Sequence, residues 1–296
     1  MPTFFQPRQR AAALQGASVL AAALILTACS ERAPPAAAVP AAVASAAPAA
    51  MPVDRQDVSE ARNIDAKVHY PALRDELAPL DRAMHAYADA QRAALAARMD
   101  KTVPAAERRE KPGRLDLDFT VATQTQDFVS ALAEGEGDFG GAHPLPLRAT
   151  FNQHLASGRI LTLTDLFSDA DAALKALSVE ARRRLAPDLE ARLHAENLAD
   201  KLLQEREKNL RDLLEGGTEP KAEDFAAFLV DGVDGKAIGI TLIFPAAQVA
   251  SYADGPQQVA VPARVFYAQL KPEFRDAFAV DKEDMDAASR KPLATP

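Results

Sequence analysis

The fold of this chain is decided by the stretch Leu115-Asp116-Leu117-Asp118-Phe119-Thr120-Val121, in which apolar and polar residues alternate strictly. Successive side chains of a β-strand point to opposite faces of its sheet, so this alternation predicts a strand with one buried face and one face in water. The i, i+2 spacing places the carboxylates of Asp116 and Asp118 together on the wet face. We interpret them as a solvated face and not as the acid pair of a glycosidase.

Further strands follow this stretch, and a helix precedes it. Strands are predicted over residues 128–132, 145–155 and 160–163, and Gly158 lies in the turn of an antiparallel hairpin that joins the last two. An amphipathic helix is predicted upstream, where apolar residues recur near helical spacing at Leu73, Leu77, Leu80, Met84, Tyr87 and Leu95.

The C-terminal half is predicted to be mainly helical. One helix begins at Asp169, and Pro187 is expected to start a second one that ends at Gly216-Gly217. Two short strands, 225–230 and 238–244, are expected to form a hairpin through a five-residue turn, Asp231–Gly235. A last amphipathic helix is predicted through Val265, Phe266 and Leu270, followed by a loose tail over residues 282–296.

The N-terminus carries a processing signal. A short basic start leads into an apolar run that ends in Leu26-Thr27-Ala28-Cys29, and this layout resembles the signal of bacterial lipoproteins. The resemblance implies cleavage after residue 28 and acylation of Cys29, the only cysteine. An uncleaved membrane anchor is the alternative, but the apolar run of about twelve residues is shorter than the roughly 20 that a spanning helix needs. Because Ser30 follows the cysteine where an inner-membrane retention signal would have aspartate, we expect the periplasmic face of the outer membrane.

The next segment is predicted to be a flexible tether. Residues 29–53 are mostly alanine and proline, a composition that forms neither a helix nor a core, so we place the folded domain at residues 54–281. Loss of Arg8 and Arg10 with the signal changes the formal net charge from −8 to about −10. This charge excludes nucleic acid as a partner and favours cationic proteins.

The order of several motifs resembles the RsiV-like family. They are Tyr70-Pro71, Gly140-Gly141-Ala142-His143-Pro144, the hairpin with Asn152, Leu163-Thr164-Asp165-Leu166-Phe167, Phe244-Pro245 and Tyr252-Ala253-Asp254-Gly255-Pro256. The family includes the extracellular domain of a lysozyme-sensing anti-sigma factor and the non-catalytic N-terminal part of some peptidoglycan deacetylases. The resemblance implies an α+β fold with an antiparallel sheet and flanking helices. It also implies a binding function, and we expect neither a sigma-binding segment nor a deacetylase domain here.

Two segments are candidate binding sites. The first is the segment with Gly140, Gly141 and His143, which is predicted to form a turn. His143 is expected either to contact a ligand or, alternatively, to cap backbone groups of the turn. In the second segment, Tyr252 is either an interface anchor or a ring that packs its loop onto the sheet, and Asp254 is more simply explained as turn chemistry.

No catalytic or cofactor-binding pattern emerges. The serines lack the Gly-x-Ser-x-Gly elbow, and the histidines lack metal-ligand spacing. We therefore expect no enzyme activity, no metal and no cofactor. The sequence favours a lipid-anchored envelope protein that binds a basic, lysozyme-like muramidase or the wall glycan. A structural envelope lipoprotein without a protein ligand is the alternative, and an unrecognised hydrolase is a third reading.

Overall fold

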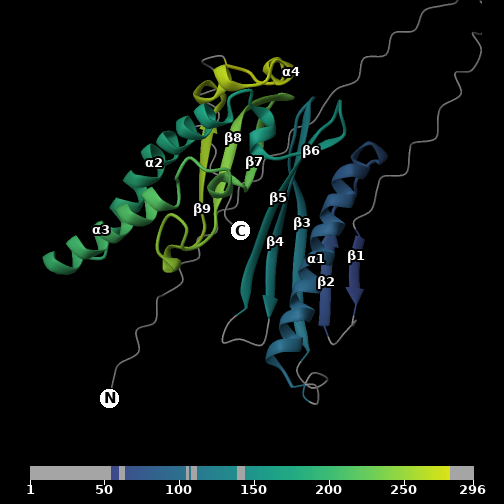
Figure 1. Cartoon of the computed structure of the whole chain (residues 1–296), viewed down its shortest axis with the longest axis horizontal. Coiled ribbons are helices and arrows are strands. Elements are labelled where there is room, and N and C mark those ends of the chain that lie inside the picture. The colour runs from purple at the N-terminus through teal and green to yellow at the C-terminus, as the bar shows by residue number, and fades with distance from the viewer. Residues whose placement is uncertain (1–54, 60–63, 105–106, 108–111, 139–143, 281–296) are drawn as a thin grey trace, which may run out of the picture. The chain divides into compact units, whose positions relative to one another are not determined.

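Two β-sheets organise the residues that the computed structural model describes, which are 55–59, 64–104, 107, 112–138 and 144–280 (Figure 1). The large sheet has the order β1-β2-β3-β4-β5-β6, and the small sheet has the order β7-β8-β9. The strands are β1 Arg55–Ser59, β2 Ile64–Tyr70, β3 Gly113–Gln124, β4 Phe128–Asp138, β5 Leu145–His154, β6 Arg159–Leu161, β7 Phe228–Val233, β8 Lys236–Phe244 and β9 Gln257–Pro262. The helices are α1 Ala78–Thr102, α2 Ala170–Ala195, α3 Asp200–Gly216 and α4 Pro272–Arg275. The shorter 3₁₀ turns are η2 Asp75–Leu77, η3 Leu163–Leu166, η4 Glu223–Phe225, η5 Tyr252–Asp254, η6 Ala263–Val265 and η7 Tyr267–Gln269.

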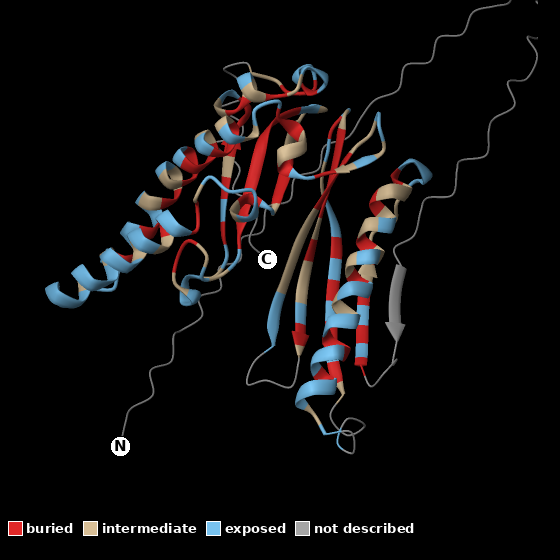
Figure 2. Cartoon of the chain, viewed as in Figure 1, coloured by how far each residue is buried: buried red, intermediate tan, exposed pale blue. Residues whose placement is uncertain are grey.

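Strand β3 has the alternating burial that its sequence predicts. Leu115, Leu117 and Phe119 are buried, while Asp116 and Asp118 are exposed, and the same alternation is visible along the strand in Figure 2. The hairpin around Gly158 is also confirmed, because β5 and β6 pair antiparallel from Asn152 to His154. The alternation of apolar and polar residues therefore predicted strand β3 and the face of it that lies in water.

The large sheet is mixed, whereas an antiparallel sheet was predicted. Strands β2 and β3 run parallel, with Ile64 opposite Gly113, and α1 makes the crossover between them. Parallel neighbours need such a long connection, and helix α1 supplies it. The other neighbouring strands in both sheets pair antiparallel. The α+β class, with helices flanking the sheets, is confirmed.

Helix α1 covers one face of the large sheet. Its buried residues Leu80, Met84, Leu95 and Met99 belong to one apolar cluster with the inward residues of β2, β3, β4 and β5. The first turn of α1 is capped from the sheet. The buried side chain of Gln153 accepts a hydrogen bond from the Leu80 N–H and donates one to the Glu76 carbonyl, both at 3.0 Å. A helix N-terminus leaves backbone N–H groups without partners, and this amide satisfies one of them.

Helix α2 covers the small sheet and does not break at Pro187, so the predicted new helix start there is wrong. Leu177, Leu185 and Leu189 are buried in a second apolar cluster that also contains residues of β7, β8 and β9. This continuous buried stripe holds the helix together on both sides of the proline, although proline removes one internal hydrogen bond. The chain turns further on, where Asn197 has a left-handed φ of 51°.

Two other predicted elements differ in the structure. The β7–β8 turn is Asp234-Gly235, with φ angles of 50° and 82°, and not the five-residue segment 231–235. Two left-handed residues make the turn that best matches strand twist, and a bulge at Asp231/Gly232 adjusts the register. The predicted helix through Val265 and Phe266 consists of the 3₁₀ turns η6 and η7. Pro272 then excludes the helical conformation at Lys271, whose ψ is 146°.

Polar side chains of the large sheet bind the free edge of β7. Ser130 Oγ accepts a hydrogen bond from the Val230 N–H at 3.0 Å and donates one to Asn152 Oδ1 at 2.7 Å. Asn152 Nδ2 donates to the Phe228 carbonyl at 2.9 Å, and the Phe228 N–H donates to Thr150 Oγ1 at 3.0 Å. Strand β7 thus crosses from β5 to β4 on the face of the large sheet that α1 does not cover.

Candidate interaction surfaces

A carboxylate-bearing face lies on the large sheet, opposite α1. Asp116 and Asp118 of β3 are directly opposite Glu136 and Glu134 of β4 in the antiparallel register. All four side chains lie on the same face of the sheet as the Ser130 side chain. This is the face opposite the apolar cluster under α1. Three of the residues are exposed and Glu134 is half-buried. We call these four residues the carboxylate face.

Gly135 allows the two strands of this face to approach closely. A Cβ atom at position 135 would lie 2.0 Å from the Asp116 backbone oxygen, which no other residue type could accommodate without a backbone shift. The Glu134-Gly135-Glu136 segment therefore projects its two carboxylates on one side while its backbone packs tightly on the other. The arrangement is built into the backbone and does not depend on flexible loops.

Side chains of the neighbouring strands lie beside three of the four carboxylates. Arg148 of β5 pairs with Glu134, and His69 Nδ1 of β2 lies 2.8 Å from Asp118 Oδ1. In the register, Lys67 is the β2 residue opposite Asp116. The face therefore presents carboxylates that are bordered by Arg148 on β5 and by Lys67 and His69 on β2.

The second surface is the loop that presents Tyr252. This ring is 67% exposed, so it is free to contact a partner and does not pack its loop onto the sheet. Asp254 closes the η5 turn, because its Oδ2 accepts hydrogen bonds from the Ser251 N–H at 3.1 Å and from the Ser251 hydroxyl at 2.6 Å. The turn chemistry predicted for Asp254 is thus present in the structure.

The base of the Tyr252 loop is fixed to the protein. Gln248 Nε2 donates to the carbonyl groups of Gly217 at 2.8 Å and Asp224 at 2.9 Å, and Val249 is fully buried. Ala247 has a left-handed φ of 69°, a conformation that is strained for a residue with a Cβ atom. Strain of this kind persists only where the surroundings impose it, so the loop is held in one conformation.

A shallow depression adjoins this loop. It is formed between α2, α3 and residues Ser251 and Asp254, with a cavity of about 30 Å³. Its apolar floor consists of Leu189, Leu193, Leu210 and Leu213, and the side chains of Arg206 and Asn209 reach its rim from α3. Sequence reasoning missed this site, because the leucines follow the ordinary spacing of an amphipathic helix.

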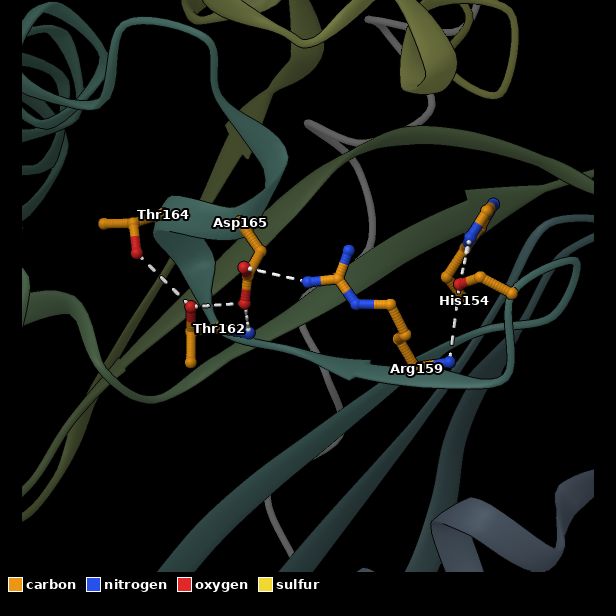
Figure 3. Close-up of polar contacts among 6 residues, drawn as sticks. His154, Arg159, Thr162, Thr164 and Asp165 are labelled. Carbon is orange, nitrogen blue, oxygen red and sulfur yellow. Dashed lines mark hydrogen bonds and ion pairs between the residues drawn. The ribbon is translucent and has the colours of Figure 1, made fainter.

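A polar cluster surrounds Asp165 in the Leu163–Phe167 motif (Figure 3). Asp165 Oδ2 accepts from the Thr162 N–H at 2.8 Å and hydroxyl at 2.7 Å, and Arg159 lies 3.2 Å from Oδ1. Burial alone would raise the pKa of Asp165, but these hydrogen bonds and the charges of Arg159 and Lys271 outweigh it and lower the pKa. The motif is therefore a capped turn whose residues Leu166 and Phe167 are buried.

Asp231 is a partly buried carboxylate on β7. Both of its oxygens accept from Thr241 Oγ1 at 2.9 Å. Desolvation raises the pKa of this carboxyl to about 6, and the hydrogen bond from Thr241 opposes the increase. We expect this residue to affect the pH dependence of stability.

Four of the predicted site residues, Cys29, Gly140, Gly141 and His143, lie outside the described residues. Within the described ranges, no group of three or more His, Cys, Asp or Glu side chains is arranged to hold a metal ion. No helix in the same ranges has the length and hydropathy needed to cross a membrane.

The chain is similar to a curated protein and to several solved structures, while no family model matches it. It is 25% identical over 219 residues to the peptidoglycan-N-acetylmuramic acid deacetylase PdaC of Bacillus subtilis (strain 168). The match covers 74% of this chain and 42% of the deacetylase, so the chain spans less than half the length of that relative. This match is consistent with the resemblance to the RsiV-like family, which includes modules of such deacetylases.

Two of the solved structures are members of the DUF3298 family. The protein from Pseudomonas aeruginosa PAO1 is 16% identical with a TM-score of 0.47, and the match covers 78% of this chain and 98% of that one. The protein from Bacteroides fragilis NCTC 9343 is 15% identical with a TM-score of 0.45, covering 75% and 93%.

Proposed function

We propose that this protein is a non-catalytic binding module of the cell envelope whose partner is a basic, lysozyme-like muramidase. The observation that carries the proposal is the carboxylate face, where Asp116 and Asp118 lie in register with Glu136 and Glu134. The muramidase approaches this face through its own lysine and arginine side chains. Cys29, as the acylated residue of a lipoprotein, holds the module at the periplasmic face of the outer membrane.

The electrostatic part of the argument concerns the rate of association. Complementary charge raises association rates between proteins and makes them depend on ionic strength, whereas exposed ion pairs add little to the affinity. The exposed carboxylates of β3 and β4 lie on strands of the large sheet, and a surface on regular strands keeps its charges in fixed positions. The face is therefore suited to attract a cationic partner at a defined orientation.

Tyr252 supplies the anchoring contact in this proposal. Tyrosine is one of the residue types that dominate the binding energy of protein interfaces, because its ring buries a large area and its hydroxyl bonds water or protein. The loop that carries it is held by Gln248 and by the Ser251–Asp254 turn, so little ordering is needed on binding.

The similarity to a peptidoglycan deacetylase supports a role at the cell wall. That relative acts on the glycan that muramidases cleave, and this chain matches 42% of its length. A module that matches only part of a wall enzyme is more simply explained by binding than by catalysis. A structural envelope lipoprotein without a protein ligand is the competing function.

Surface plasmon resonance with a strongly basic lysozyme tests the proposal. We expect binding whose association rate constant falls as salt increases. The double variant Asp116→Asn/Glu136→Gln, which keeps the shape of both side chains, should lower the association rate at low salt by about three- to tenfold.

The matched control is Asp188→Asn/Glu190→Gln, which removes the same charge from exposed positions on α2. Its association rate should stay within about twofold of the parent, because a general loss of charge has a smaller effect than a local one. Equal effects of the two double variants, or no binding of the muramidase at all, would favour the structural function.

A further inference from the structure

Among the described residues, no strand covers one edge of the small sheet. Its order is β7-β8-β9, and side chains of the large sheet bind the outer edge of β7, so β9 forms the remaining edge (Figure 1). We propose that β9 is a homodimer interface, at which it pairs antiparallel with β9 of a second copy of this chain. This inference is independent of the muramidase proposal, because β9 contains none of the four residues of the carboxylate face.

The register determines which backbone groups of β9 point outward. The Ile243 N–H of β8 donates on the β7 side, to the carbonyl that precedes β7, at 2.9 Å. The next residue along β8 in either direction bonds toward β9, where Leu242 lies opposite Val259. By the same alternation, the N–H and C=O groups of Gln258 and Ala260, on either side of Val259, point away from the sheet.

These outward groups have no partner in the part of the chain that the structure describes. No backbone or side-chain hydrogen bond reaches the outward N–H or C=O group of Gln258 or Ala260 there. Gln258 is exposed and Ala260 is half-buried, so this edge lies in water. A row of unpaired backbone donors and acceptors at a sheet edge is a template for a further strand.

The sequence of β9 lacks the features that protect other sheet edges from pairing. Charged side chains and proline are the common protection. In the large sheet, β1 carries Arg55 and Asp57, and the part of β5 that β6 does not cover carries Pro146 and Arg148. Strand β9 has no charged residue, and its proline is its last residue. Two acidic chains can therefore meet at β9 without placing like charges opposite each other.

The free groups of β9 are self-complementary, which favours a second copy as the partner. A twofold axis at Val259 places Gln258 opposite Ala260 of the second copy, and Ala260 opposite its Gln258. Each such pair exchanges both of its N–H···O bonds, so every outward group of these residues gains a partner. Val259 then lies opposite its own counterpart, a cross-strand contact that suits β-branched side chains. The small sheets of the two copies become one continuous sheet.

The strand is held in position before it pairs. Val259 and Val261 are buried in the apolar cluster that α2 covers. At the start of the strand, Gln257 Nε2 donates to the Asp254 carbonyl at 2.8 Å. Because the edge is already extended and anchored, association orders few additional groups.

Disulfide cross-linking of the full chain tests this pairing. Opposite residues of a non-hydrogen-bonded pair have Cα atoms about 4.5 Å apart, a separation that a disulfide accepts. Val259→Cys should therefore give a covalent dimer on non-reducing gels after mild oxidation of cells that produce the protein. Val261→Cys is the matched control, because two residues at position 261 are about 14 Å apart along the paired strands. It should give no more dimer than the parent chain, whose only cysteine is Cys29.

A second pair of variants tests the same register at less buried positions. Chains with Gln258→Cys and chains with Ala260→Cys should cross-link to each other when they are produced together, and much less when either is produced alone. Ala260→Pro, added to Val259→Cys, removes an outward N–H without breaking the pairing with β8 and should lower the dimer yield about tenfold. Ala260→Ser keeps this N–H and should leave the yield unchanged.

Three results would overturn the proposal. The first is the absence of both the Val259→Cys dimer and the dimer of Gln258→Cys with Ala260→Cys, which would leave the edge to an extended segment of another protein. The second is equal cross-linking of Val261→Cys and Val259→Cys, which would indicate random collision. The third is an unchanged dimer yield in the Ala260→Pro variant.

Discussion

Replacing Ser130 with alanine tests how the two sheets are joined. The Ser130 hydroxyl is buried, accepts from the Val230 N–H and donates to Asn152 Oδ1. Ser130→Ala removes both bonds and leaves a buried backbone donor and a buried amide oxygen without partners. Asn152 Nδ2 cannot replace the hydroxyl as the acceptor for the Val230 N–H, because it is itself a donor and already donates to the Phe228 carbonyl.

The expected loss follows from the cost of those two groups. A buried polar group left without a partner costs about 1–3 kcal/mol, so we expect Ser130→Ala to lower the free energy of unfolding by about 3 kcal/mol. For a domain of this size that corresponds to a fall in Tm of about 6–12 °C. Thr150→Val removes the single acceptor of the Phe228 N–H without changing shape and should cost about 1–2 kcal/mol.

Urea denaturation of a chain beginning at Asp54, followed by circular dichroism, measures these changes. Ser157→Ala is the control, because the Ser157 hydroxyl lies in an exposed turn beside His154. We expect this variant to stay within about 0.5 kcal/mol of the parent. A Ser130→Ala loss no larger than that of the control would refute the assignment of these hydrogen bonds as the joint between the sheets.

Three further predictions concern other parts of the chain. The raised pKa of Asp231 means that ionisation of its carboxyl is less favourable in the folded state than in the unfolded state. The free energy of unfolding should therefore fall by about 2 kcal/mol as the pH rises from about 4 to about 6. Asp231→Asn should remove this pH-dependent fall in urea titrations across the same range. An unchanged step in the variant would assign the titration to another group. Ala247→Gly should relieve the left-handed strain and raise the free energy of unfolding by about 1 kcal/mol in the same assay, and a loss of stability would mean that the conformation is not strained. Cys29→Ala should abolish incorporation of labelled fatty acid in cells and leave an unprocessed precursor, whereas undiminished label would end the lipoprotein interpretation.

Local patterns in the sequence predicted the strands well, because the period of a half-buried strand depends on adjacent residues. The alternation from Leu115 to Val121 gives both the strand and its wet face. The parallel pairing of β2 with β3 could not be predicted in this way, since it depends on how α1 packs across the sheet. Pro187 shows the opposite case, in which a strong local signal is overcome by the buried stripe of Leu185 and Leu189.

The candidate surfaces depend on register and on contacts between distant segments. Glu134 and Glu136 alternate with glycine, which is a signal for a shared face, but their position opposite Asp118 and Asp116 requires the β3–β4 register. Ser130 lies within the strand predicted over residues 128–132, and no motif there indicates a nucleophile. Its place in an otherwise apolar strand was a signal that a buried hydroxyl needs a partner, but the sequence could not identify β7 as that partner.

Zero-length cross-linking between carboxylates and lysines tests the central claim most directly. After the protein is mixed with a basic lysozyme and treated with a carbodiimide, mass spectrometry identifies which carboxylates are joined to lysozyme lysines. The account predicts cross-links from Asp116, Asp118, Glu134 or Glu136, because an amide bond forms only between groups already in contact. Cross-links confined to the carboxylates of α2 and α3, or none at all under conditions where the two proteins are mixed at high concentration, would contradict it.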